Sequence, residues 1–165
     1  MRIDDIEAAG REIISIVGDY TKQPHREMLI DPILYGYLKG RFTSIARQHH
    51  VRVYGSNRPR RIDFRKGGSN PVVLELAVRP PTGGGHLLGG QNVSELRKLC
   101  KVSKTQARLR ALLLIDLYAR YYLRDDLKAS FDAINAGPGK FTRSSVRVVY
   151  VHRRNAFNFA WNPYK

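Results

Sequence analysis

The sequence predicts a single α/β domain in which a mixed central sheet is covered by helices on both faces. The chain has 165 residues, a length that fits one domain with one core. Segments with apolar residues at helical spacing are interleaved with short β-branched or alternating segments, and glycine- or proline-containing stretches separate them. We therefore expect the order helix, helix, three strands, helix, strand, helix and one or two final strands.

The N-terminal part of the chain is predicted to hold two helices and three strands. Residues 4–18 carry apolar side chains at helical spacing, and we expect this helix to end at Gly18. A second helix is expected to begin with Asp31 as its N-cap and Pro32 in its first position, and to continue to about His49. The strands follow at residues 51–54, 60–65 and 71–79, with a turn at 66–70.

The C-terminal part is predicted to alternate between helices and strands. Ser94 is expected to cap a short helix that turns Leu96 and Leu99 inward. Residues 108–118 are apolar enough for a buried strand, although a helix is the alternative there. A helix at 123–134 and strands at 145–151 and 157–161 complete the expected order.

Composition excludes several classes of protein. Hydrophobic residues make up 42% of the chain, which is too many for a disordered basic tail. No segment approaches the ~20 apolar residues of a membrane span. A single cysteine, Cys100, excludes an internal disulfide framework and a cysteine-based zinc site. Because the first residues mix charges and lack a signal-peptide core, we expect a soluble cytoplasmic protein.

The balance of charge points to a polyanionic partner. The chain has 29 Lys and Arg against 14 Asp and Glu, a formal net charge of +15. Basic residues spread along a whole globular chain favour nucleic acid as the partner. An anionic membrane surface fits less well, because no long amphipathic helix with a basic face is evident. An acidic protein partner, or charge retained only for solubility, stays open.

Two carboxylates interrupt otherwise apolar strands. Asp63 lies within an Ile/Phe segment, and Glu75 lies within the most apolar strand of the chain. A carboxylate in a buried strand is costly unless it is paired or binds a metal. Two of them on neighbouring strands can converge on one hard cation, and Mg²⁺ commonly takes one or two carboxylates together with waters and substrate phosphate. The pair therefore predicts a magnesium site that acts on phosphate, although pairing of Asp63 with nearby arginines is an alternative.

Asp63, followed by a turn and then Glu75-Leu76-Ala77, resembles the active-site core of the PD-(D/E)XK, or restriction-endonuclease-like, nuclease superfamily. In that family an Asp on one strand precedes an (Asp/Glu)-X-Lys tripeptide on the next. The family's core of helix, three strands, helix and strand is similar to the order expected for residues 31–118, and residues 94–99 resemble the helix after the active-site strands. The resemblance implies a restriction-endonuclease-like fold and hydrolysis of phosphodiester bonds, usually in DNA, with Mg²⁺ or Mn²⁺ on Asp63 and Glu75.

The sequence departs from the family pattern at the lysine, whose position is occupied by Ala77. In the family that lysine positions and activates the attacking water. Strand alternation puts Arg79 on the same face as Glu75, so Arg79 is one candidate for the missing charge. Lys98, on the following helix, is a second candidate, because some family members supply the charge from that helix. Lys66, in the turn, is a weaker third.

Two further carboxylates lie near the expected site or in a buried strand. Glu27 precedes the second expected helix, and the family often adds a helix-borne Glu to the metal site, so the resemblance implies Glu27 as a further metal ligand. Asp116 lies in a buried strand, where a structural pairing with a nearby arginine is favoured over metal binding.

Basic side chains around these carboxylates are expected to contact nucleic acid, with DNA favoured over RNA. They are Arg58, Arg60, Arg61, Arg65, Lys66, Lys101 and Lys104. The sequence thus predicts a metal-dependent nuclease, with a catalytically degenerate protein that only binds nucleic acid as the alternative. A basic scaffold protein with structural carboxylates is a third possibility. A homodimer stays open, since small nucleases that cut both strands often dimerise.

Overall fold

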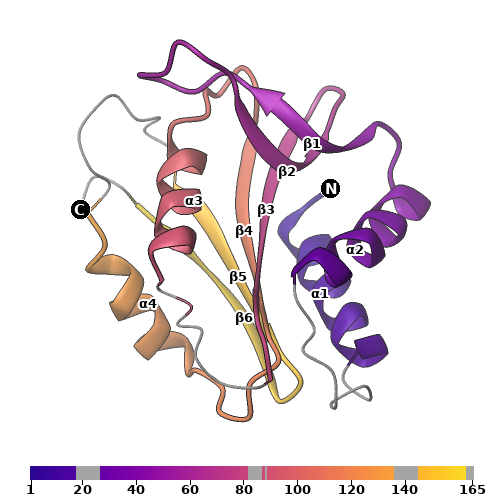
Figure 1. The fold of residues 1–165 in the computed structure, drawn as a ribbon, viewed down its shortest axis with the longest axis vertical. Coiled ribbons are helices and arrows are strands. Elements are labelled where there is room, and N and C mark those ends of the chain that lie inside the picture. Colours follow the sequence, from indigo (N-terminus) through magenta and orange to yellow (C-terminus); the bar gives the residue numbers. More distant parts are fainter. Residues whose placement is uncertain (18–26, 82–86, 88, 136–144, 163–165) are drawn as a thin grey trace.

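The computed structural model of this chain describes residues 1–17, 27–81, 87, 89–135 and 145–162 (Figure 1). Over these residues the chain forms four helices and six strands. In chain order they are α1 (Ile3–Val17), α2 (Glu27–Arg41), β1 (Ile45–Val51), β2 (Arg60–Lys66), β3 (Val72–Arg79), α3 (Gly90–Cys100), β4 (Leu109–Asp116), α4 (Arg124–Asp132), β5 (Val146–His152) and β6 (Asn155–Trp161). None of the described helices is long and apolar enough to cross a membrane.

The strands form one open mixed sheet in the order β1-β2-β3-β4-β5-β6. Its middle strands, β3, β4 and β5, are parallel, and the crossovers between them contain α3 and α4. The β1–β2, β2–β3 and β5–β6 pairs are antiparallel. The predicted α/β class with a mixed central sheet is therefore confirmed.

The helices lie in pairs on the two faces of the sheet (Figure 1). α1 and α2 cover one face, where Leu74 and Leu76 of β3 join their apolar core. α3 and α4 cover the other face, where Val73 and Ala77 belong to a second core. Because alternate residues of a strand face opposite sides, Glu75 points toward α3. Burial on both faces explains why the central strands read as nearly continuous apolar runs.

The segment around β1 differs from the sequence prediction. α2 begins at Glu27 rather than Asp31, and it ends at Arg41, so residues 45–49 form a strand and not the end of a helix. Asp31 is not an N-cap; it lies inside the helix, and its Oδ1 is 2.6 Å from Nη2 of Arg47 on β1. Pairing of β1 with β2 has overridden the helical spacing of the apolar residues after Arg41.

Two other element boundaries differ from those that the sequence predicts. The strand expected at residues 51–54 is absent from this described region: β1 ends at Val51, and Val53 makes a single antiparallel bridge to Val102. α3 begins at Gly90 with Gly89 as its N-cap, so Ser94 lies inside the helix. The segment at 108–118 is a strand, as predicted, and the helical alternative is wrong.

Candidate active site

Asp63 and Glu75 lie side by side where β2 and β3 separate. Between these two fully described strands, the register pairs run from Lys66–Val72 to Phe64–Leu74, one residue before the carboxylates. Beyond that point each carboxylate accepts a backbone N–H from the opposite strand. Glu75 Oε2 accepts from Asp63 N–H at 3.4 Å, and Asp63 Oδ2 accepts from Leu76 N–H at 2.9 Å. The predicted convergence of the two carboxylates is therefore present.

A lysine from α3 contacts one of these two carboxylates. Lys98 Nζ lies 2.5 Å from Glu75 Oε1, and it also contacts Glu95 one turn earlier on the helix. The same ammonium donates to the carbonyl oxygen of Arg61 at 2.8 Å. Glu75 is only 1% exposed, so its carboxyl group faces Lys98 in an environment that excludes most water.

Glu27, at the start of α2, borders the same region. A hollow of about 330 Å³ is lined by Glu27, Asp31, Arg47, Gln48, Arg61 and Asp63. Burial, Asp63 and Glu95 raise the pKa of Glu27 to about 7. The structure thus places Glu27 near the predicted carboxylates, and its role as a metal ligand stays a prediction.

The carboxylates outnumber the cations that neutralise them. Burial and the neighbouring Asp63 raise the pKa of Glu75 above its ordinary value, and the charge of Lys98 offsets only part of this. Burial acts to lower the pKa of Lys98, but Glu75 and Glu95 outweigh it, so that pKa is raised. The region therefore holds negative charge at close quarters, which favours a proton or an added cation.

The donor set suits a hard cation with few protein ligands. Among the described residues, no group of three or more His, Cys, Asp or Glu side chains is arranged to hold an ion. Mg²⁺ commonly uses one or two carboxylates and keeps several waters, and carboxylates also suit Mn²⁺. Glu75 Oε1 is a buried acceptor, and the contact it makes among the described residues is the ion pair with the Lys98 ammonium. Asp63 and Glu75 therefore fit a two-carboxylate Mg²⁺ or Mn²⁺ site.

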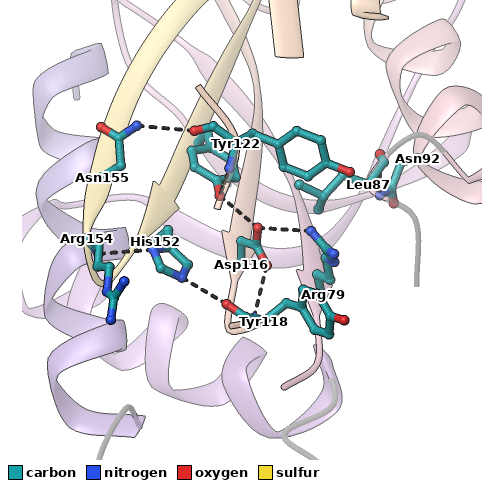
Figure 2. Close-up of polar contacts among 10 residues, drawn as sticks. Arg79, Leu87, Asn92, Asp116, Tyr118, Tyr122, His152, Arg154 and Asn155 are labelled. Carbon is teal, nitrogen blue, oxygen red and sulfur yellow. Dashed lines mark hydrogen bonds and ion pairs between the residues drawn. The ribbon is translucent and has the colours of Figure 1, made fainter. Parts of the chain in front are cut away.

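Arg79 is not brought to this site. It lies at the end of β3, four residues from Glu75, which corresponds to roughly 13 Å along a strand. Figure 2 shows its guanidinium beside Asp116, with Nη1 3.3 Å from Oδ2. Its Cζ also lies 4.2 Å from the ring centre of Tyr118 and 5.4 Å from that of Tyr122. The expectation that Arg79 reaches the carboxylates is wrong, and the predicted structural pairing of Asp116 with an arginine is confirmed.

The other basic residues singled out in the sequence are dispersed. Lys66 Nζ donates to the carbonyl oxygen of Gly67 at 3.0 Å, and Arg65 contacts His49 Nε2 at 3.2 Å. Lys104 lines a hollow with Arg108, away from the carboxylates. The remaining cations near the site line a groove beside α3; they are Arg60, Arg61, Arg97, Lys98 and Lys101. Arg58 lies just before β2 and is exposed.

Three residues near the site are not among those that the sequence predicts for it. Glu95 shares a face of α3 with Lys98, and their spacing of three residues is a signal that the sequence contains. Asp31, before Pro32, fits the sequence pattern of an N-cap, so the sequence gives no indication that it lines the hollow beside Asp63. Gln48 falls between the register pairs Arg47–Phe64 and His49–Ile62, hence across from Asp63, and has a φ of 48°. A left-handed non-glycine residue inside a strand is uncommon, and such residues cluster at functional sites.

Comparison with known proteins adds no relative: no protein-family model, curated protein or solved structure matches this chain.

Proposed function

We propose that this chain is a metal-dependent nuclease that hydrolyses phosphodiester bonds, with DNA as the favoured substrate. One observation carries the proposal. The buried carboxylate of Glu75 lies beside Asp63 on the next strand and is contacted by an ammonium, Lys98, from the following helix. Two carboxylates and one lysine are the chemical elements of the PD-(D/E)XK site, although the lysine comes from a different position.

Lys98 is the group we assign to the role of the missing lysine. Ala77, where the tripeptide pattern would place the lysine, is 2% exposed and packs in the core beneath α3 and α4. Lys98 enters from α3 and reaches Glu75 without occupying that core position. Its ammonium can hydrogen-bond the attacking water and offset negative charge that develops on the phosphate.

Asp63 and Glu75 are the residues we assign to hold Mg²⁺ or Mn²⁺, with Glu27 as a further carboxylate on the edge of the site. The bound ion would lower the pKa of its water and stabilise charge on the phosphoryl and leaving oxygens. The backbone N–H groups of Asp63 and Leu76 fix the two carboxylates in orientation. Arg61 and Arg47, which line the adjoining hollow, supply positive charge for a polyanionic substrate.

The test is a cleavage assay on supercoiled plasmid, single-stranded DNA and RNA with Mg²⁺, Mn²⁺ or EDTA. Wild type is expected to cut only with metal, and Glu75→Gln, Asp63→Asn and Lys98→Ala each to reduce the rate at least a hundredfold. Asp125→Asn and Lys128→Ala on α4 are matched controls, because both residues lie away from the site.

Binding without cutting under every metal condition would contradict the proposal. That result would favour the degenerate nucleic-acid-binding protein, for which the ion pair between Lys98 and Glu75 would be purely structural. Equal cleavage by wild type and Lys98→Ala, with loss in Glu75→Gln, would instead remove Lys98 from its assigned role.

A further inference from the structure

A second hollow adjoins the carboxylates on the outer side of α3. It has a volume of about 490 Å³ and lies between α3, the start of β2 and the segment that follows β1. We call it the basic groove. Its charged lining consists of Arg60, Arg61, Arg97, Lys98, Lys101 and Glu95.

One wall of the basic groove is a single face of α3. Arg97 and Lys98 lie three and four residues after Ser94, and Lys101, the C-cap, lies four and three residues after them, so these residues share one side of the helix and its C-terminal end. Leu96, on the opposite side, is fully buried against the sheet. The helix is therefore fixed by its apolar face while its basic face is presented to the groove.

The other wall carries an aromatic ring. Tyr54 lines the groove and is 42% exposed, which makes it one of the large apolar side chains that remain open to solvent. Its backbone is anchored: Tyr54 N–H donates to the carbonyl oxygen of Lys101 at 3.0 Å, and the adjacent Val53 bridges to Val102. Val53 is buried, whereas Tyr54 is not, so the exposed ring is held on a fixed stretch of backbone.

The basic groove leads to the candidate active site. Arg61 lines both the groove and the hollow that contains Glu27 and Asp63. Lys98 lines the groove, and its ammonium contacts Glu75. A chain of phosphates that follows the groove would therefore arrive at the carboxylates.

We infer that the basic groove binds a single-stranded segment of nucleic acid, with one base stacked on Tyr54 and the phosphates against Arg60, Arg61 and Lys101. Aromatic platforms within basic channels are how proteins bind single strands without sequence preference. A base in a duplex has its faces covered by its neighbours, so an exposed ring contributes little to duplex binding. That the bound strand is then cleaved rests on the proposed nuclease function. The inference names single-stranded nucleic acid as the substrate class of that site.

The experiment measures binding without catalysis. Fluorescence anisotropy is followed in EDTA with a short thymidine oligomer, a uridine oligomer and a DNA duplex. We expect wild type to bind the single strands more tightly than the duplex, and the tighter of the thymidine and uridine oligomers to identify DNA or RNA. Tyr54→Ala is expected to weaken single-strand binding about tenfold, whereas Tyr54→Phe keeps the ring and the affinity.

Tyr121→Ala is the matched control, since Tyr121 is also 42% exposed and lies beside His152 at the end of β5. It should bind like wild type. Arg60→Ala combined with Lys101→Ala should reduce the slope of log affinity against log salt by ~0.7 for each phosphate that the protein no longer neutralises.

Equal affinity of Tyr54→Ala and wild type, or duplex binding as tight as single-strand binding, would overturn the inference. These measurements need neither metal nor cleavage. A protein that binds as expected but does not cut would contradict the proposed function alone, and a protein that cuts but ignores Tyr54→Ala would contradict the groove alone.

Discussion

Glu75 and Asp116 are equally buried, each 1% exposed, yet their surroundings differ completely. Asp116, on β4, has partners on both oxygens. Oδ2 accepts from the Tyr150 hydroxyl at 2.7 Å and from Arg79 at 3.3 Å, and Oδ1 accepts from Tyr118 N–H at 3.0 Å. Figure 2 shows how this network continues through His152, whose Nε2 lies 2.9 Å from the Tyr118 carbonyl oxygen.

Glu75 lies among carboxylates instead. Asp63 is beside it, Glu95 shares the same lysine, and Lys98 is the cation that contacts it among the described residues. A buried polar network whose members are all satisfied rigidifies a fold, whereas uncompensated charge is typical of sites that bind or react. Burial of a carboxylate therefore does not by itself indicate function; the balance between the carboxylate and its partners does.

The largest expected effect is on stability, at Asp116. Asp116→Ala leaves the partly buried guanidinium of Arg79 without its carboxylate partner and removes the acceptor of the Tyr150 hydroxyl. Loss of one partner of a buried ion pair typically costs about 3–5 kcal/mol of unfolding free energy. Urea denaturation followed by circular dichroism measures it, with Asp125→Ala as the control because that side chain is 91% exposed. A loss of unfolding free energy below ~1 kcal/mol would contradict a structural role for Asp116.

The same experiment on Glu75→Gln should give the opposite sign. In EDTA at pH 7 the substitution removes a buried carboxylate next to Asp63, and Lys98 keeps its contact with Glu95. We expect unfolding free energy to rise by about 1 kcal/mol, because burial and Asp63 raise the pKa of Glu75 and the folded state therefore favours an uncharged group, which Gln supplies. A loss of stability comparable to that of Asp116→Ala would place Glu75 among the structural carboxylates.

A smaller, pH-dependent effect is expected at Glu27. Its pKa of about 7 in the folded protein lies above the ordinary 4.5, so the folded state holds this proton more tightly than the unfolded state. The resulting stabilisation is complete below pH 4.5 and is lost as the pH rises through 7. Glu27→Gln should therefore match wild type near pH 4 and be more stable by about 1 kcal/mol at pH 8, a value reduced for partial solvent screening.

Urea denaturation of the metal-free protein at both pH values tests this. Glu12→Gln, on the exposed side of α1, is the control; the difference between its stability and that of wild type should be the same at both pH values. A Glu27→Gln variant less stable than wild type at pH 8 would mean that Glu27 is favourably paired.

The smallest effect concerns Cys100, at the end of the helix that supplies Lys98. Its side chain is buried, and burial raises its pKa to about 11. We expect little reaction with Ellman's reagent at pH 8 in the native protein and full reaction in urea, because the thiolate is the reactive form. Rapid native labelling would show that α3 opens, and Lys98 would then not be held in a fixed place.

The sequence was sufficient where the pattern was local. β2, β3 and β4 could be predicted because β-branched and apolar residues fill them, and the carboxylates stand out against that background. Asp63 and Glu75 are singled out for the same reason, and Lys98 is among the candidates for the missing charge.

The sequence was insufficient where contacts between distant residues decided the outcome. Residues 45–49 continue a helical spacing, yet they form β1 because β2 pairs with them. Strand alternation correctly put Arg79 on the face of Glu75, but alternation carries no information about distance along the strand or about Asp116 on β4. The choice between Arg79 and Lys98 therefore required the tertiary structure.

The left-handed residue in β1 has a consequence for the edge of the sheet. β1 is the first strand of the sheet order, and β2 is its partner there. A long, flat edge strand recruits strands from other chains and leads to aggregation. Here Arg47 places a charge, and Gln48 a left-handed backbone conformation, in the middle of the edge. The residue across from Asp63 thus also protects the sheet against intermolecular growth.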